Sequence, residues 1–370
     1  MKIAQVGDYS VSNWGDQLYP GVSRHLFDTL GLGVEPAYFA PLKGTTAAGE
    51  PIHPYADIGS SGARAVLVGG GDLIRFDTRT VALDHMSIPH ESRRGRLLRW
   101  RADAFARRHL ARGPGAWVPT EPWVKDTPTA LVSVGIHPIP QGPDVARAFS
   151  HVKAAWARTR NGVEHLQGAG VAPERIVLAP DMIFGLRELT QPDAARARGA
   201  AVFAERLGVD EPPLLFHAAT FHGWPQERVE AALSSLRGMP LAVLSLGAYS
   251  GEDRVLAAAA RATGVGELIG LATNDITAAL AAAGAVFTTS MHAAIVGGSF
   301  GTPVFVPGVK KTSEAFAVCP VPPPVQGVEE SELAAAVHAR LGSRTGHDPR
   351  PNAEAVAAAM RTVAERVGLS

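Results

Sequence analysis

Residues 282–307, AAGAVFTTSMHAAIVGGSFGTPVFVP, contain the pattern that decides the fold class. We expect a buried strand over 285–289, a tight turn, a helix of small residues over 292–299 and a second buried strand over 303–306. Apolar runs of this length between turn residues are typical of strands that are covered on both faces. His292, the one titratable side chain in the stretch, falls where a strand ends and a helix begins. Open α/β sheets bind their ligands at such points.

The helix that begins near His292 predicts an anion site. Its first turn offers free backbone N–H groups and the positive end of the helix dipole, and both favour a negatively charged ligand. Lys310 and Lys311 follow the second strand closely, in a chain that contains only six lysines. We therefore expect one imidazole and two ammonium groups at neighbouring strand ends of a single sheet, around a small anion.

The composition limits the class of protein. A chain of 370 residues suggests two domains. The 35 basic residues balance the 35 acidic ones, so no overall charge attracts nucleic acid, and we expect no nucleic-acid partner. Cys319 is the one cysteine, which excludes an internal disulfide and a cysteine-based zinc site. No HExxH sequence or carboxylate cluster indicates a metal, and we expect neither a metal nor a cofactor.

The hydrophobic segments predict a protein without a membrane span. The first ten residues lack the apolar segment of a secretory signal. Residues 276–309 carry no Asp, Glu, Lys or Arg and are long enough to cross a bilayer, but Thr, Ser, His and Gly break them into strand and helix pieces of soluble size. We expect a cytoplasmic protein with at most peripheral membrane contact.

The first half of the chain alternates strands with loops and helices. Strands are expected over 2–6, 34–39, 63–68, 129–134, 156–160 and 175–178. Asn13 and Asp16, in the loop after the first strand, either cradle a phosphate or form a turn and a helix N-cap. Gly70 and Gly71 follow the third strand and let the backbone approach another group closely. Asp72 then either caps the next segment or binds a sugar hydroxyl.

The second half repeats the alternation more regularly. Strands are expected over 213–218, 241–246 and 267–271, with helices between them and a last amphipathic helix over 353–367. Such alternation favours parallel pairing with right-handed crossovers. We therefore predict two doubly wound α/β domains, residues 1–188 and 189–345, that face each other across a cleft. Residues 346–370 are expected to form a helix that packs back on the first domain.

Several polar and aromatic residues lie near the ends of predicted strands. His137 follows the fourth strand, and His217, His222 and Trp224 occur in FHAATFHGW. The histidines are candidates for the cleft wall, and Trp224 is a candidate for stacking on a sugar. Eight arginines lie between residues 93 and 112. They form either a solvated helix face or a patch for an anionic acceptor or a phosphorylated lipid carrier.

The order of short motifs resembles the polysaccharide pyruvyl transferase family. That family has a GNxGD loop, a GGG loop after a strand, an SIGP-like strand end, an RDxxS segment, a PDP turn, an SxRLH motif and a later lysine. The corresponding segments here are NWGD (13–16), LVGGGDLI (67–74), VSVGIHP (132–138), ARTRNGVEHLQGAGV (157–171), VLAPD (177–181), TTSMHAAI (288–295) and VPGVKKTSEAF (306–316).

The resemblance implies a GT-B-like pair of Rossmann domains. It also implies transfer of the enolpyruvyl unit of phosphoenolpyruvate onto two hydroxyls of a sugar-containing or lipid-linked acceptor, which forms a ketal. In that interpretation the second domain holds the donor, the first holds the acceptor, and His292 is the general acid and base. Lys310, Lys311, Arg158 and Arg160 are then expected to bind the substrate.

The sequence departs from the family pattern at two positions. Ser290 stands where the family has the arginine of SxRLH, and Asn161 stands where it has the acid of RDxxS. Serine cannot form a bidentate pair with a carboxylate or phosphate. Either another cation compensates for the missing arginine or the donor differs.

Three alternative functions stay open. The first is a GT-B glycosyltransferase that uses a nucleotide sugar, with Glu252, Asp253 or Asp275 on the ribose. The others are a relative with a different small anionic donor and a binding protein that has lost catalysis. The acceptor and the oligomeric state cannot be inferred.

Overall fold

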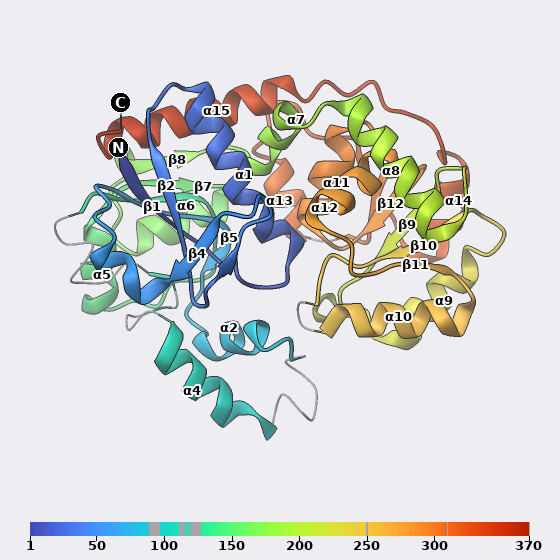
Figure 1. Cartoon of the computed structure of the whole chain (residues 1–370), viewed down its shortest axis with the longest axis horizontal. Helices are drawn as coiled ribbons and strands as arrows, with labels where there is room; N and C mark the ends of the chain where they lie inside the picture. Colours follow the sequence, from blue (N-terminus) through green and yellow to red (C-terminus); the bar gives the residue numbers. More distant parts are fainter. Residues whose placement is uncertain are drawn as a thin grey trace.

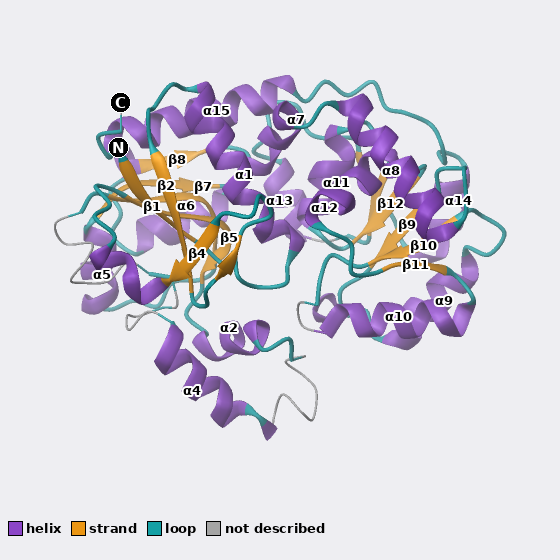
Figure 2. Cartoon of the chain, viewed as in Figure 1, coloured by secondary structure: helices purple, strands orange, loops and turns teal. Residues whose placement is uncertain are grey.

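Two β-sheets lie side by side and carry helices on both faces (Figures 1 and 2). The computed structural model describes residues 1–88, 97–110, 115, 117–118, 127–248, 251–308 and 310–369. The predicted fold class, two α/β units with mainly parallel sheets in a GT-B-like arrangement, is confirmed. The boundary at residue 188 stays a prediction. Among the described residues no helix has the length and apolar character that crossing a bilayer requires.

The first sheet has eight strands in the order β3-β4-β2-β1-β5-β6-β7-β8. Neighbouring strands pair in parallel, apart from the antiparallel edge pair β3–β4. No strand is predicted between residues 39 and 63, but this segment contains β3, β4 and a short 3-10 helix. The strand bounds are β1 Lys2–Val6, β2 Glu35–Ala40, β3 Gly44–Thr45, β4 Pro51–Pro54, β5 Val66–Ile74, β6 Thr129–Ile136, β7 Val152–Ala157 and β8 Ile176–Leu178.

Alternate side chains of these strands pack on opposite faces of the sheet, as the two-residue period of a strand requires. Ala130 and Ala154 face a core that includes α1 (Trp14–Thr29) and α15 (Arg350–Arg366). Leu131 and Ala155 face the other core, which includes α5 (Pro143–Ser150) and α6 (Arg160–Gly168). Both faces are therefore buried, which explains why these strands are continuous apolar runs.

The second sheet has six parallel strands in the order β11-β10-β9-β12-β13-β14. One face packs against α9 and α10, and the other against α11 and α12. The strand bounds are β9 Leu214–His217, β10 Leu241–Leu244, β11 Gly266–Leu268, β12 Ala285–Thr288, β13 Val304–Val306 and β14 Val325–Gly327. The helix bounds are α8 Pro192–Leu207, α9 Gln226–Ser235, α10 Glu252–Thr263, α11 Thr273–Ala282, α12 Met291–Ser299, α13 Lys310–Phe316 and α14 Leu333–His338.

The stretch 282–307 folds as its pattern predicts. It forms the end of α11, then β12, α12 and β13, and all of β12 and β13 is buried. Ser290 is the N-cap of α12, and its hydroxyl accepts a hydrogen bond from the backbone N–H of Ala293 at 3.4 Å. Strand β14 was not predicted, because it directly follows the proline-rich segment 320–324, which interrupts the strand and helix pattern.

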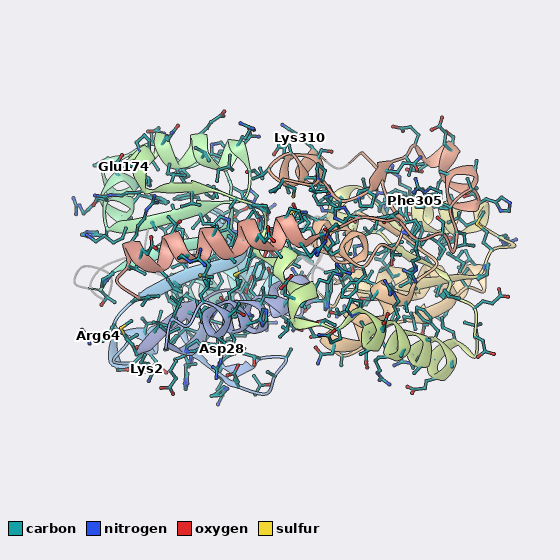
Figure 3. The ribbon with its side chains drawn as sticks, turned by 90° about the horizontal axis from the view of Figure 1, so that it is seen from above. Lys2, Asp28, Arg64, Glu174, Phe305 and Lys310 are labelled. Atoms are coloured by element: carbon teal, nitrogen blue, oxygen red, sulfur yellow. The ribbon has the colours of Figure 1, made fainter. Side chains whose placement is uncertain are left out.

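One continuous core joins the two sheets. It contains residues of α1 and α15, which pack on the first sheet, and of α8, α11 and α12, which belong to the unit of the second sheet. Helix α15 follows the second sheet in sequence but packs against β7 of the first sheet and against the 3-10 helix Met182–Gly185. Figure 3 shows this red C-terminal helix running across the first sheet to the middle of the molecule.

Candidate functional site

A cleft lies at the carboxyl ends of the central strands, with walls from both halves of the molecule. Its volume is about 120 Å³. The first half contributes Asp8, Asn13, Asp16, Asp72, Leu73, Arg75 and Arg158, and the second contributes His217, Ala219, Phe221, His222, Leu246, Glu252, Thr289, Ser290, Met291, His292 and Thr312. The cleft therefore sits where doubly wound sheets hold their ligands.

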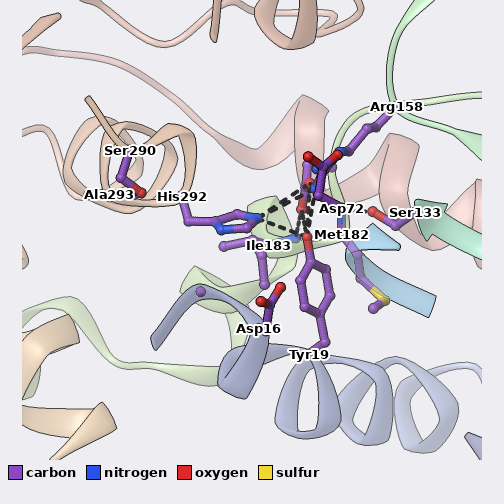
Figure 4. A network of polar contacts seen from close by, with 12 residues as sticks. Asp16, Tyr19, Asp72, Ser133, Arg158, Met182, Ile183, Ser290, His292 and Ala293 are labelled. Atoms are coloured by element: carbon purple, nitrogen blue, oxygen red, sulfur yellow. Dashed lines mark hydrogen bonds and ion pairs between the residues drawn. The ribbon is translucent and has the colours of Figure 1, made fainter. Parts of the chain in front are cut away.

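Four side chains from four separate segments form a polar network beside this cleft (Figure 4). The hydroxyl of Tyr19 lies 2.9 Å from Nε2 of His292 and 3.0 Å from Oδ2 of Asp181. Arg158 donates from Nη1 to the Tyr19 hydroxyl at 3.0 Å and to Oδ2 of Asp181 at 2.6 Å. His292 Nε2 also lies 3.8 Å from Oδ2 of Asp181. Helix α12 of the second sheet is thus connected through His292 to the first sheet.

The start of α1 positions the tyrosine of this network. Asn13 is the N-cap, and its Oδ1 accepts a hydrogen bond from the backbone N–H of Gly15 at 3.2 Å. Its Nδ2 donates to Oδ2 of Asp16 at 2.7 Å. Asp16 and Tyr19 are three residues apart and so lie on one face of the helix, toward the cleft. The turn and N-cap interpretation of Asn13 therefore describes what this residue does in the fold.

Glycines let α1 approach both β5 and α12. Gly70 and Gly71 of β5 have φ angles of +83° and +93°, a region that L side chains rarely adopt. A Cβ atom at Gly70 would overlap the Tyr19 side chain, and one at Gly71 would overlap the Asp16 carboxylate. A Cβ atom at Gly15 would likewise overlap the His292 ring. The close backbone approach predicted for Gly70 and Gly71 is therefore made by α1.

Asp181 is held in a single orientation by backbone groups around it. Its Oδ1 accepts a hydrogen bond from the backbone N–H of Ile183 at 2.9 Å. The backbone N–H of Met182, one residue before Ile183, donates a hydrogen bond to Oγ of Ser133 on β6 at 2.8 Å. These bonds fix the turn that follows β8, and the carboxylate consequently points at Tyr19 and Arg158.

Charge pairing decides the protonation of the network. Burial opposes ionisation of Asp181, but Arg158 and His292 outweigh it and hold the pKa of the carboxyl well below its usual range. Burial also disfavours the charge of Arg158, yet Tyr19, Asp181 and Asp72 raise its pKa. Burial, with Asp181 adding to it, raises the pKa of Tyr19 well above 10. The network thus contains a carboxylate, a guanidinium and a neutral phenol.

This protonation state sets the tautomer of His292. The phenol oxygen of Tyr19 has one hydrogen and two lone pairs. The hydrogen points to the ionised Asp181, and one lone pair accepts from Arg158. The second lone pair faces Nε2 of His292, so we place a proton on that nitrogen.

Asp72 extends the network toward solvent. Arg158 Nη2 lies 3.5 Å from Oδ1 of Asp72, and His137 Nε2 lies 2.8 Å from its Oδ2. Asp72 lines the cleft, whereas the side chain of His137 is 48% exposed and does not line it. Asp72 belongs to β5, so the third predicted strand is longer than the sequence suggested.

The second sheet contributes a buried histidine–carboxylate pair. His217 ends β9, and its Nε2 lies 3.0 Å from Oε1 of Glu252 while its Nδ1 lies 2.9 Å from Oγ1 of Thr288. Glu252 Oε1 also accepts from the backbone N–H of Leu246 at 3.3 Å. Glu252 begins α10, so its negative charge lies at the positive end of that helix.

Of the predicted cations, Arg158 lies beside His292, with its Nη1 3.5 Å from Nε2 of the imidazole, whereas Lys310 and Arg160 do not line the cleft. The side chain of Lys310 is 85% exposed and pairs with Glu314 at 3.5 Å, and Figure 3 shows it at the edge of the molecule. The buried residues of α13 in the described part of the chain are Thr312, Ala315 and Phe316, and Lys310 lies outside this buried side of the helix. Lys311 belongs to the same helix, but its side chain lies outside the described residues. Arg160 is exposed at the start of α6 and does not line the cleft.

Other residues of the site escaped the sequence analysis. Tyr19 and Asp181 are central to the network, although neither was a candidate. The single signal for Tyr19 was its spacing of three from Asp16, and for Asp181 its position directly after a strand. Trp224 was wrongly predicted to stack on a sugar: it is buried against Phe216 and Phe287.

No three or more His, Cys, Asp or Glu side chains in the described part of the chain are grouped so that they could hold a metal ion. The cleft itself is rich in carboxylates, with Asp8, Asp16, Asp72 and Glu252 against Arg75 and Arg158. Both arginines are already paired, Arg75 with Asp84 at 3.1 Å and Arg158 with Asp181. The cleft can therefore bind hydroxyl groups through its acids and an anion at the first turn of α12.

Comparison of the sequence with protein families and with curated proteins gives no match. Comparison of structures gives full-length matches. A putative UDP-N-acetylglucosamine 2-epimerase from Listeria monocytogenes is 14% identical, with 98% of this chain and 95% of that chain covered and a TM-score of 0.55. The UDP-GlcNAc 2-epimerase from Neisseria meningitidis, bound to UDP-GlcNAc, is 10% identical, with 99% and 100% covered and a TM-score of 0.55. S. aureus MnaA with UDP is 12% identical, with 100% and 97% covered and a TM-score of 0.58. At these identities the matches show the GT-B-like fold.

The hypothesis of pyruvyl transfer from phosphoenolpyruvate is contradicted by these comparisons. The neighbours are nucleotide-sugar enzymes, and no pyruvyl transferase is among those described. The site explains why the motifs misled. Ser290 caps a helix, Lys310 points to solvent, and Arg158 is neutralised by Asp181. A compact donor with about three negative charges finds no set of unpaired cations among these residues.

Proposed function

We propose that this chain is an enzyme that binds a nucleoside diphosphate sugar in the cleft and breaks the bond between the anomeric carbon and the diphosphate. The full-length fold likeness to UDP-GlcNAc 2-epimerases supports a uridine nucleotide as the first candidate ligand. The observation that carries the proposal is the polarity of the cleft: a helix N-terminus on one wall and a group of carboxylates on the other.

The diphosphate is assigned to the first turn of α12. Thr289, Ser290, Met291 and His292 all line the cleft, so the amino end of this helix faces the ligand. Ser290 uses its hydroxyl to cap Ala293, and this leaves the helix start compact and uncharged. Backbone N–H groups and the helix dipole stabilise an anion there without a lysine or an arginine.

The sugar is assigned to Asp16 of α1 and Asp72 of β5. Carboxylates accept hydrogen bonds from hydroxyl groups, and each can take two or more. Asp16 is held by Asn13, and Asp72 is held by Arg158 and His137, so both present fixed oxygens. As the anomeric bond breaks, positive charge develops on the sugar, and nearby carboxylates stabilise it.

The reaction begins with departure of the diphosphate. The carbon–oxygen bond breaks, its electron pair goes to the diphosphate, and the start of α12 stabilises the added charge. His292 lies in the first turn of that helix, and its Nε2 lies 3.8 Å from Oδ2 of Asp181 and 3.5 Å from Nη1 of Arg158. His292 is thus the proposed acid, while Tyr19 and Arg158 position it. Glycosyl transfer and epimerisation both start with this step.

A charge placed at the helix start tests the assignment of the diphosphate. Aspartate and asparagine are both good N-caps, so Ser290→Asp and Ser290→Asn should leave α12 intact. The aspartate adds a negative charge beside the diphosphate. We expect Ser290→Asp to weaken UDP binding about tenfold or more, and Ser290→Asn to bind nearly as the parent protein does. Isothermal titration with UDP measures both, with phosphoenolpyruvate as the comparison ligand. Equal affinities of the two variants would refute the assignment.

Positional isotope exchange tests the bond that breaks. UDP-GlcNAc labelled with heavy oxygen in the bridge to the sugar is incubated with the protein and followed by phosphorus NMR. Reversible cleavage scrambles the label into non-bridging positions of the diphosphate, and the anomeric proton spectrum shows whether an epimer accumulates. His292→Gln should abolish scrambling while UDP still binds. An unchanged label and an unchanged sugar in the parent protein, with the nucleotide bound, would contradict the proposed reaction.

A further inference from the structure

Helices α2 (Thr78–His85) and α4 (Arg99–His109) project beyond the first sheet, at the bottom of Figure 1. They pack on each other through a small apolar core that contains Ala82, Leu83 and Ala102. The ring of Phe105 stacks on His85 of α2. One face of α4 is therefore occupied by α2, and the opposite face is left to be explained.

The outer face of α4 combines arginines with large apolar side chains. Trp100, Arg101, Ala104, Arg107 and Arg108 are all exposed, and their spacing of i, i+1, i+4, i+7 and i+8 puts them on one side of the helix. Trp100 is 64% exposed, and Leu97, two residues before the helix, is 75% exposed. We refer to Leu97, Trp100, Arg101, Ala104, Arg107 and Arg108 as the outer face.

The charge of this face is strongly positive. Between residues 97 and 110 there are four arginines and one acid, in a chain whose overall charge is zero. Arg79 of α2 donates to the carboxylate of Asp103, from Nε to Oδ1 at 2.8 Å and from Nη2 to Oδ2 at 3.0 Å. These bonds lower the pKa of Asp103. The guanidinium of Arg101 lies over the Trp100 ring, 5.3 Å from its centroid. Asp103 also interacts with Arg107 of the outer face, so one acid stands against four arginines in this helix and an excess of positive charge remains.

We propose that the outer face of α4 binds the surface of a bilayer that contains anionic phospholipid. Arginines on a helix contribute through the negative surface potential, and a tryptophan with a leucine inserts at the level of the headgroups. Charge complementarity selects anionic lipid over zwitterionic lipid. The two exposed apolar side chains select a bilayer over nucleic acid, since nucleic acid attracts the arginines but offers no apolar layer to a leucine.

The helix pair that carries the outer face contacts the cleft wall through α2. Two residues of the cleft wall pair with α2. Oδ1 of Asp8 lies 2.8 Å from Nε2 of His85, and Nη1 of Arg75 lies 3.1 Å from Oδ2 of Asp84. The helix pair that carries the outer face is therefore fixed to the cleft wall by two ion pairs. A bilayer bound at the outer face is therefore separated from the cleft wall by α2.

Vesicle flotation of the purified full-length protein tests the proposal. The probes are vesicles of phosphatidylcholine alone and of equal parts phosphatidylcholine and phosphatidylglycerol. We expect binding to the anionic vesicles alone, and a roughly tenfold or larger loss for Arg101→Glu/Arg108→Glu. The matched control is Arg237→Glu/Arg340→Glu, two exposed arginines of the second half, which should bind like the parent protein. Circular dichroism confirms that both variants fold.

Quenching of tryptophan fluorescence by brominated phosphatidylglycerol shows which residue enters the bilayer. The four other tryptophans of the described residues are at most 1% exposed, and a Trp123→Phe background removes the one tryptophan outside those residues, so Trp100 should account for the quenching. Trp100→Phe should keep flotation but lose the quenching. Absent binding to the anionic vesicles, or equal binding by the two charge variants, overturns the proposal. The proposal is also overturned if the protein binds a DNA duplex but does not float with the vesicles, and if Arg101→Glu/Arg108→Glu abolishes the DNA binding. None of these readouts depends on nucleotide binding.

Discussion

Replacing Arg158 with methionine should destabilise the fold by about 3–5 kcal/mol, because it leaves a buried carboxylate without its partner. Arg158 is 1% exposed and Asp181 is not exposed at all. At 2.6 Å, with an effective dielectric constant of about 20, the pair attracts by roughly 6 kcal/mol, an amount similar to the cost of burying the charges. Methionine has a similar length and keeps the packing, so the measured loss reports mainly the unpaired charge.

The sign of a second substitution distinguishes this explanation from simple loss of packing. Asp181→Asn should destabilise the parent protein, where it removes the partner of Arg158. In the Arg158→Met background the same substitution should stabilise, because it removes the unpaired charge and keeps the acceptor for the N–H of Ile183. Urea unfolding of the four proteins, followed by circular dichroism, gives the cycle. Equal destabilisation by Asp181→Asn in both backgrounds would refute the reasoning.

The pair also predicts an acid dependence. The pKa of Asp181 is held below its unfolded value of about 3.9. A depressed pKa gives stability that is complete above the unfolded pKa and is lost as the pH falls toward the folded pKa. The parent protein should therefore lose more stability below about pH 4 than Asp181→Asn does.

Two further predictions concern single residues outside the charged pair. Cys319 should react very slowly with iodoacetamide at pH 8, because burial raises the pKa of its thiol to about 12; this leaves roughly a thousandfold less thiolate than an ordinary cysteine has. Mass spectrometry should find rapid alkylation once urea unfolds the chain, and fast labelling of the folded protein would show that the thiol is accessible. Gly71→Ala should lower the free energy of unfolding by about 1–3 kcal/mol or more, because the φ angle of Gly71 is +93° and a Cβ atom there would overlap Asp16. Gly59→Ala is the matched control, because nothing lies within 4 Å of a Cβ there, and equal melting temperatures of the two variants would refute the packing argument.

Local pattern was sufficient to predict most of the second sheet. In 282–307 the apolar runs are uninterrupted and turn residues flank them, so β12, α12 and β13 could be placed within a residue or two. Strand β14 is three residues long and exposed in part, so it leaves almost no pattern. The same is true of β3, which has two residues.

The site was harder to predict because its contacts join segments that are distant in sequence. Tyr19 meets Asp181 and His292 across 162 and 273 residues, and nothing local to any of the three indicates the others. Lys310 looked like a ligand because lysines are rare, but its direction depends on which side of α13 is buried. The glycine motifs that suggested a pyruvyl transferase reflect close packing of α1 on β5.

A crystal structure with UDP-GlcNAc would show where the diphosphate and the sugar bind. We expect the diphosphate within hydrogen-bond distance of the backbone N–H of Met291 or His292, and the sugar hydroxyls in contact with Asp16 or Asp72. A nucleotide bound outside the cleft, or with its diphosphate away from the first turn of α12, would contradict this expectation.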